Sequence, residues 1–334
     1  MNEGGRCHGG PDRAFAARWD FSTCANAAGP CPAVLAAVRA ADPARYPDPD
    51  CAGVRERLAA LHGVPPHRIL LAASASEFVQ RVTAVGARLL PGPVAVPRHA
   101  YGDYATAARA WGRAVQSEAA GPAVPTLRWC AEPSSPLGDD AAPPPDPERV
   151  PTVLDAVYAP LRLHGHGRWQ DPDRAGVFVL HSPNKALGLC GVRGAYAVAP
   201  ERAAWDVAAW CRALEAALPS WPLGAQGVAM LGAWASDEVQ QWVCDTRPRL
   251  AEWKGALAQA LAARDFEVRA SVTPFFCVRP PLPLAASRLR GHGVGVRDAA
   301  SFDLAGWWRV SAQPPAAISA LASALDALSR KEHP

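Results

Sequence analysis

The stretch GVFVLHSPNKALGLCGVRGAYAVAP, residues 176–200, contains two short apolar runs, 176–182 and 194–200, on either side of a glycine-rich loop. Apolar runs of this length, bounded by glycine and proline, are typical of buried β-strands. The loop carries Lys185, with Arg193 eight residues further on. A lysine at a strand end can pack its stem and reach water with its amine. Its place directly after a buried strand nevertheless favours a functional amine.

The same alternation of short apolar strands with helical patterns runs through the first two thirds of the chain. Further strands are predicted at 68–74, 93–97 and 152–158. Helices, with apolar residues at three- and four-residue spacing, are predicted at 32–41, 51–63 and 76–90. This pattern predicts an α/β fold with a doubly wound, mostly parallel sheet. Ligands bind such sheets at the carboxyl ends of the strands, where Asp155, Ser182 and Lys185 fall.

The last third of the chain has a different pattern. Long helices are followed by sheet-like runs at 266–280, 293–298 and 307–313, which predict a smaller α+β domain. The proline-rich, acidic stretch 131–151 lies between sheet-like runs and is interpreted as a loop. We therefore expect an N-terminal arm with part of the small domain at 1–44, a large domain at 45–205, and a small C-terminal α+β domain at 206–334.

The composition excludes several classes of function. The 334 residues are 49% hydrophobic with a net charge of +3, which gives no special attraction to nucleic acid or to acidic membranes. No stretch approaches the roughly eighteen uninterrupted apolar residues of a membrane helix, and the first residues do not resemble a secretion signal. The nine cysteines are scattered without a C-x-x-C pair, so we expect free thiols and no metal site. The chain is expected to be soluble and cytoplasmic.

At this point a resemblance adds to the pattern. The motif S-x-x-K-x-x-G-L-x-G-x-R-x-A-Y at 182–196 resembles the cofactor segment of the fold-type I pyridoxal-phosphate (PLP) enzymes, the class I/II aminotransferases. HGG (8–10), WDFSTCAN (19–26), GPCP (29–32) and RYPDPDC (45–51) are similar to segments of the threonine-phosphate decarboxylases of cobalamin synthesis and the histidinol-phosphate aminotransferases. The resemblance covers nearly the whole chain. It implies a PLP cofactor bound by the 45–205 domain, a small amino-acid-type substrate and a homodimer.

Three residues receive catalytic roles from this resemblance. Lys185 forms a Schiff base with the cofactor and moves a proton on the bound substrate. Asp155 pairs with the pyridine nitrogen, and a ring kept protonated in this way is a better electron sink. Tyr158 donates to the phenolic oxygen of the cofactor. Taken alone, Asp155 could cap a loop and Tyr158 could serve packing.

Further residues are assigned to cofactor binding. The resemblance places the phosphate on donors at Ala75, Ser76, Ser182 and Arg193. The stretch AASASEF (72–78) runs from a strand into a helix, and a helix start presents unpaired N–H groups to an anion. Tyr101 matches the aromatic residue that stacks on the pyridine ring. Tyr46 matches the tyrosine that reaches the phosphate of the neighbouring subunit, so the site is expected to need a dimer.

Five positions are assigned to the substrate. Arg309 matches the arginine that pairs with the substrate carboxylate, and Arg297 matches a second arginine that meets a substrate phosphate or other distal anion. His8, with the adjacent Gly9, matches an N-terminal phosphate clamp, although a disordered N-terminus is the alternative. Asn26 is a weaker candidate near the substrate.

The sequence also departs from the family pattern. Ser135 replaces the asparagine of the N-P-T-G segment, which in the family contacts the phenolic oxygen of the cofactor, and is assigned to cofactor binding although its side chain is shorter. Ala156 replaces the acid that follows the strand aspartate. The phosphate loop at 72–78 lacks the usual glycines, and the stretch between 138 and 155 is too short and too rich in proline for the usual helix. We expect PLP binding to survive in a pocket that is rebuilt on one side.

Three functions follow from these features. The first is a PLP-dependent aminotransferase acting on an amino acid, a phosphorylated amino acid or an amino alcohol. The second is a decarboxylase of the L-threonine-O-3-phosphate type, in which the carboxylate leaves as carbon dioxide. The third, suggested by Ser135 and the shortened loop, is a catalytically altered PLP-binding homologue that serves as an assembly or regulatory partner.

Overall fold

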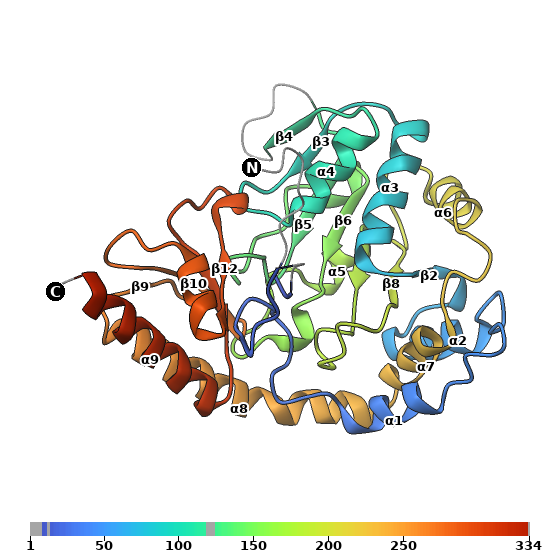
Figure 1. The fold of residues 1–334 in the computed structure, drawn as a ribbon. Coiled ribbons are helices and arrows are strands. Elements are labelled where there is room, and N and C mark those ends of the chain that lie inside the picture. Colours follow the sequence, from blue (N-terminus) through green and yellow to red (C-terminus); the bar gives the residue numbers. More distant parts are fainter. Residues whose placement is uncertain (1–8, 12–13, 118–123, 333–334) are drawn as a thin grey trace.

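The computed structural model describes residues 9–11, 14–117 and 124–332 (Figure 1). Its centre is a seven-stranded sheet in the order β2-β8-β7-β6-β5-β3-β4. The strands are β2 (Ile69–Ala72), β3 (Val94–Val96), β4 (Val115–Ser117), β5 (Leu127–Ala131), β6 (Thr152–Asp155), β7 (Phe178–His181) and β8 (Ala195–Val198). Strand β8 is antiparallel to both of its neighbours, and the other pairs are parallel. The predicted α/β fold with a mostly parallel sheet is confirmed.

Helices cover both faces of this sheet (Figure 1). One face carries α3 (Ala75–Leu89), α4 (Gly102–Ala110) and α6 (Val207–Ala216). The other carries α1 (Pro32–Ala40), α2 (Ala52–His62) and α7 (Ala225–Trp234). Neighbouring strand residues point to opposite faces. In β2, Leu70 therefore packs on the face covered by α3, α4 and α6, and Leu71 on the face covered by α1, α2 and α7. Burial on both faces explains why these strands are almost wholly apolar.

A second unit is built around a four-stranded antiparallel sheet in the order β12-β13-β10-β9. Its strands are β9 (Glu267–Val268), β10 (Phe275–Arg279), β12 (Arg297–Asp298) and β13 (Trp308–Ser311), and its helices are α8 (Asp237–Ala262) and α9 (Pro315–Glu332). Strand β1 (Trp19–Asp20) pairs in parallel with β11 (Val294–Gly295), so residues near the N-terminus join this C-terminal unit. Helix α6 packs on α3 and β2 of the large unit, and the boundary expected at residue 205 stays a proposal.

Short helical segments complete the chain: α5 (Asp171–Arg174), η1 (Pro66–Arg68), η2 (Pro147–Arg149), η3 (Ala159–Leu161), η4 (Ala286–His292) and η5 (Ala300–Phe302). Between Gly138 and β6 the chain forms only the short η2, so the helix that the sequence lacks is also missing from this described segment. Within the described ranges, no helix combines the length and the apolar character needed to cross a membrane.

The strand ends determine where a site can form. Ala131 of β5 pairs with Asp155 of β6, and Asp155 pairs with Leu180 of β7, so the three strands end side by side. Helix α3 begins only three residues after β2 ends. The carboxyl edge of the sheet therefore presents the loop after β7, Asp155 and the start of α3 to the same space.

Candidate active site

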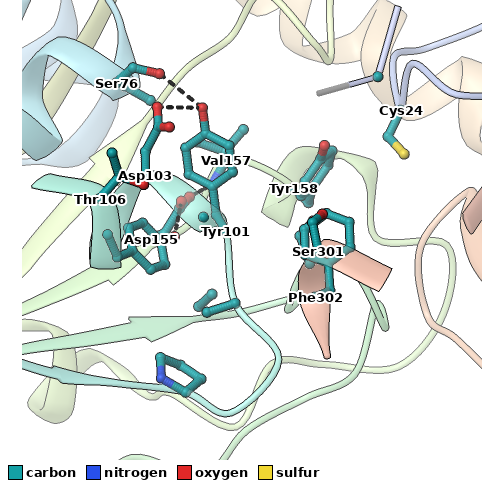
Figure 2. A pocket seen from close by; sticks show the side chains of 18 of the residues that line it. Cys24, Ser76, Tyr101, Asp103, Thr106, Asp155, Val157, Tyr158, Ser301 and Phe302 are labelled. Carbon is teal, nitrogen blue, oxygen red and sulfur yellow. Dashed lines mark hydrogen bonds between the residues drawn. The ribbon is translucent and has the colours of Figure 1, made fainter. Parts of the chain in front are cut away.

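A cavity of about 590 Å³ lies at this edge, between the large sheet and the small one (Figure 2). Most of the site residues predicted from the sequence line it: Gly9, Ala75, Ser76, Tyr101, Ser135, Asp155, Tyr158, Ser182, Lys185, Arg193, Arg297 and Arg309. These residues come from elements spread over the whole chain. The fold thus brings these residues together in one cavity.

Three predicted residues are not among those that line the cavity. Tyr46 is 79% exposed and stacks on Trp221, with the ring centroids 4.4 Å apart. Asn26 is buried beside the cavity wall, where its amide donates to the carbonyl of Ala186 and to Thr246 Oγ1. Asn26 thus supports the loop of Lys185 through hydrogen bonds, and its expected role near the substrate stays a prediction. His8 lies outside the described residues.

Lys185 follows β7 in the loop that the sequence singled out. Its side chain is partly buried, and its Nζ lies 5.7 Å from the centre of the Tyr158 ring. Tyr158 packs edge-to-face against Phe275, with the ring centroids 4.6 Å apart. The carbonyl of Lys185 accepts a hydrogen bond of 2.8 Å from the backbone N–H of Asn26. The lysine therefore projects from a loop whose backbone is fixed.

Asp155 ends β6 and faces the cavity with two hydrogen bonds already made. Its Oδ2 accepts from the hydroxyl of Tyr104, and its Oδ1 accepts from the backbone N–H of Val157 at 3.0 Å. Burial raises the pKa of the Asp155 carboxyl, while Tyr104, Val157 and Lys185 act in the opposite direction. Tyr104 itself stacks on Trp129 at 4.3 Å between centroids, so the carboxyl group is held rigidly.

The start of α3 can receive an anion. Ser74 caps the helix by accepting from the backbone N–H of Glu77 at 3.0 Å, so Ala75 and Ser76 occupy its first turn. Backbone N–H groups in a first turn have no helical partner and favour negative charge. Ser182, which also lines the cavity, donates to Asn184 Oδ1 at 2.9 Å, and Arg193 adds an exposed positive charge.

Tyr101 stands between the helix start and a buried acid (Figure 2). Its hydroxyl donates to Asp103 Oδ2 at 2.8 Å and lies 3.0 Å from Ser76 Oγ. Because the Tyr101 proton is directed at Asp103, Ser76 is the donor in the second contact. Burial raises the pKa of the Tyr101 phenol, which stays protonated and available for these bonds.

Arg309 is buried in β13 with its guanidinium directed at neutral oxygens. Its Nη1 donates to Ser135 Oγ at 3.0 Å and its Nη2 to the carbonyl of Ser22 at 3.2 Å. Its Nε has no hydrogen-bond partner among the described residues. A buried guanidinium held in this way has donor capacity for a carboxylate.

Arg297, in β12, is the second buried guanidinium of the cavity. Its Nη2 donates to Ser301 Oγ at 2.6 Å and its Nη1 to the carbonyl of Asp298 at 2.8 Å. The two arginines lie on the small-domain side of the cavity, whereas Lys185 and Asp155 lie on the large-sheet side. A molecule bound in the cavity would thus be held from both sides.

The N-terminal segment also reaches the cavity. Gly9 lines it, and a Cβ at this position would lie 2.2 Å from the carbonyl oxygen of Ser22. The backbone N–H of Gly10 donates to Ser22 Oγ at 2.7 Å, and Ser22 in turn is held by Asp20. Only glycine allows this close approach at position 9.

Sequence reasoning missed several residues of the cavity: Cys24, Asp103, Tyr104, Ser301 and Phe302. Tyr104 and Asp103 gave no signal, because no helix is predicted after Tyr101 and Tyr104 contacts Asp155 across 51 residues. Phe302 had none, since a lone phenylalanine beside a loop is more often a core residue.

An amine, a partly buried carboxylate and two buried arginines, gathered at the carboxyl edge of a doubly wound sheet, define an enzyme site for a small anionic molecule. Residues 131–326 match the family model described as Aminotransferase class I and II. This match spans more than half of the chain, and the protein therefore belongs to the class I and II aminotransferase family. The predicted resemblance to these enzymes is confirmed.

Individual relatives agree with this assignment. A histidinol-phosphate aminotransferase of Ruegeria pomeroyi is 28% identical, over 90% of this chain and 88% of the relative. The structure of histidinol-phosphate aminotransferase from Sinorhizobium meliloti in complex with pyridoxal-5'-phosphate has a TM-score of 0.76 at 20% identity, covering 92% of this chain and 89% of that one. The structure of L-threonine-O-3-phosphate decarboxylase from Porphyromonas gingivalis has a TM-score of 0.72 at 20% identity, covering 89% and 92%. These two structures share the fold of this chain.

Proposed function

We propose that this aminotransferase uses PLP bound at Lys185, and that its substrate is an amino acid, or a phosphorylated amino acid or amino alcohol, whose distal anion Arg297 would receive. The observation that carries the proposal is the presence of Lys185 and Asp155 in one cavity with Arg309. The relative named histidinol-phosphate aminotransferase supports a phosphorylated substrate.

The residues present fit PLP at each of its functional groups. The first turn of α3, with Ser182 and Arg193, offers donors and positive charge for the phosphate. Asp155 offers a partly buried carboxylate for the pyridine nitrogen, and Tyr101 offers an aromatic face for the ring. The Tyr158 ring lies 5.7 Å from Lys185 Nζ, and its hydroxyl is the donor proposed for the phenolic oxygen. These assignments are consistent in size with a cavity of about 590 Å³.

When bound, PLP withdraws electrons from the α-carbon of the substrate, so that a bond standing perpendicular to its ring can break. The amine of Lys185 is the group placed to remove the α-proton and return it. Asp155 keeps a proton on the facing nitrogen, because a paired carboxylate favours the charged form of its partner. Arg309 grips the substrate carboxylate and so decides which bond stands upright.

This last role separates the two candidate reactions. If Arg309 receives the substrate carboxylate, this group would be held while Lys185 takes the α-proton, and transamination would follow. Ser135 lies beside this arginine, since its hydroxyl accepts from Arg309 Nη1 at 3.0 Å. If the distal anion of the substrate takes both arginines, the carboxylate would be free of Arg309, and PLP would supply the electron sink for its loss as carbon dioxide. Decarboxylation of a phosphorylated amino acid is therefore the second candidate, and the fold shared with the threonine-phosphate decarboxylase favours keeping it.

We further propose a homodimer in which Tyr46 of one chain serves the site of the other. Tyr46 and Trp221 form a stacked aromatic pair that is largely exposed in the single chain. Exposed aromatic pairs are typical of surfaces that are covered by a partner.

The lysine content of the chain allows a direct test of the cofactor assignment. Lysine occurs at only three positions: Lys185, Lys254 and Lys331. After incubation with PLP and reduction with borohydride, peptide mapping should place the label on Lys185, and Lys185→Ala should abolish the visible absorbance of the bound cofactor. Lys254 is the strongest competitor, because burial lowers its pKa to about 8, so Lys254→Ala is the matched control. A label on Lys254 in place of Lys185 would refute the assignment.

An amino-acid screen then decides the reaction. Release of a 2-oxo acid with loss of the visible band indicates transamination, and release of carbon dioxide indicates decarboxylation. A protein that binds PLP at Lys185 but responds to no amino acid would be the catalytically altered homologue.

A further inference from the structure

The two buried arginines of the cavity are direct neighbours across strands. Arg297 of β12 pairs with Arg309 of β13 in the antiparallel register. Side chains at paired positions leave the same face of a sheet with their Cβ atoms about 4.5–5.5 Å apart, and like charges in this relation repel each other. Hydrogen bonds anchor each guanidinium separately, and a contact shared by both groups would fix their separation.

The ring of Phe302 makes such a shared contact with both guanidinium groups. Its centroid lies 5.0 Å from the central carbon of the Arg297 guanidinium and 5.4 Å from that of Arg309. Phe275 also faces Arg309, at 5.6 Å. The negative face of an aromatic ring attracts a cation, and one ring that contacts both cations fixes each relative to the other.

Phe302 itself is held in place by its surroundings. It is 7% exposed and ends η5, whose Ser301 accepts the hydrogen bond from Arg297. The carbonyl of Phe302 accepts from His99 Nδ1 at 2.7 Å, and the next residue, Asp303, pairs with Arg98 at 3.2 Å. The segment that carries Phe302 is thus fastened both to the small sheet and to the loop that leads to Tyr101.

Phe302 lines the cavity together with both arginines, and Figure 2 shows it near Tyr158 and away from Asp155. We propose that Phe302 is a specificity-determining residue: its ring sets the separation of the two guanidinium groups and thereby selects substrates by the distance between their two anionic groups. This inference rests on the proposed function, in which Arg309 receives the carboxylate and Arg297 the distal anion.

Anion binding tests the inference without turnover. The probes are malonate, succinate, glutarate and adipate, which lack an amine and differ by one methylene each, with acetate as the monoanion. Their dissociation constants are measured by calorimetry on the PLP-treated protein. The wild type should prefer one chain length clearly. Phe302→Leu should weaken that best dianion by about tenfold and leave the dianions within about threefold of one another, whereas acetate should change by less than about threefold.

Three further variants separate specificity from folding. Phe266→Leu makes the same change in the core of the small domain, where Phe266 packs on Trp308 at 5.6 Å, and should keep the wild-type order of affinities. Phe302→Tyr keeps the aromatic face and should keep the order as well. If Phe302→Leu does not fold, Phe302→Met fills the space without an aromatic face and should flatten the order.

The inference is overturned if the wild type binds all four dianions equally, or if Phe302→Leu and Phe302→Met weaken every anion by the same factor. The proposed function fails separately, on the absence of a PLP label at Lys185. A wild type that is labelled at Lys185 but shows no preference for chain length would refute only the role of Phe302.

Discussion

The hydroxyl of Tyr101 joins a buried acid to the helix start that is proposed to bind phosphate. It donates to Asp103, which is 4% exposed, and accepts from Ser76 in the first turn of α3. A hydrogen bond to a charged group contributes roughly 1.5–3 kcal/mol. At the residue scale, Asp103 therefore orients the aromatic ring proposed to stack on the cofactor.

Asp103→Asn should accordingly weaken PLP binding by about tenfold, because the ring loses its charged acceptor. The measurement is a titration of the cofactor-free protein with PLP, followed by the visible band. Asp245→Asn, which changes an exposed acid on α8 bonded to Gln241, should leave the affinity unchanged. An Asp103→Asn protein with wild-type affinity would show that Tyr101 does not depend on this acid.

Gly9 provides a second test at this scale. A methyl group at position 9 would meet the carbonyl oxygen of Ser22, which also accepts from Arg309. Gly9→Ala should therefore raise the substrate KM by about tenfold and leave PLP affinity unchanged, since Lys185 and α3 are not touched. Gly255→Ala is the matched control, because a Cβ there meets nothing within 4 Å. Equal KM values for the two variants would contradict the role of the Gly9 contact.

At the scale of elements, α2, β7, β8 and α7 meet around a pair of histidines. His62 Nε2 lies 2.8 Å from the hydroxyl of Tyr196, which also accepts from Trp234 at 3.1 Å. The His62 ring faces His181 at 4.7 Å between centroids. Burial lowers the pKa of His62 from 6.5 to about 4, with Arg174 acting in the same direction, and it lowers the pKa of His181 as well.

The stability of the protein should therefore fall as the pH falls from about 6.5 to 4. In this window His62 binds a proton in the unfolded chain but not in the folded one, so acid favours unfolding; below pH 4 both states carry it and the loss ends. The shift corresponds to about 3 kcal/mol. His62→Gln, which cannot titrate, should lose less stability across this window in urea unfolding. His164→Gln, in an exposed loop, should behave as the wild type. Parallel curves for His62→Gln and the wild type would exclude this origin.

The sequence predicted some elements better than others, for physical reasons. Strands β6, β7 and β8 are continuous apolar runs buried on both faces, and periodicity detects such runs. Strand β5 reads LRWCA, where an arginine interrupts the pattern, so it was not among the predicted strands. The short loop after Gly138 was predicted. The contacts that hold the wider stretch 131–151 were not predicted, because their partners are distant in sequence. Glu132 accepts from the backbone N–H groups of Arg168 and Trp169, 36 and 37 residues further on, and Asp140 pairs with Arg162.

The same contrast holds for the site as a whole. Lys185, Asp155 and Arg309 could be predicted because each falls in a local motif or at a strand end. Tyr104 contacts Asp155, which lies 51 residues further along the chain, and Phe302 contacts Arg309 on the neighbouring strand β13. No local sequence pattern predicts these contacts. The family resemblance located the chemistry, whereas the shape of the anion pocket required the fold.

At the scale of the whole molecule, the proposed dimer predicts an unusual mixing result. Lys185→Ala removes the amine, and Tyr46→Ala removes the tyrosine proposed to reach across, so each variant alone should be inactive or strongly weakened. In a mixed dimer, the chain that keeps Lys185 is faced by the chain that keeps Tyr46, and one site is complete. Equal mixing after unfolding and refolding should then restore about a quarter of the wild-type activity, because half of the dimers are mixed and half of their sites are complete.

This recovery of activity requires Tyr46 of one chain to reach the cavity of the other. Tyr46 is 79% exposed and does not line the cavity of its own chain, so a role within that cavity would require it to move. If Tyr46 instead served its own chain, neither site of a mixed dimer would be complete and mixing would restore nothing. Wild-type protein carried through the same refolding gives the reference activity. Sedimentation of each variant should show the mass of a dimer, since neither change removes Trp221 from the exposed surface.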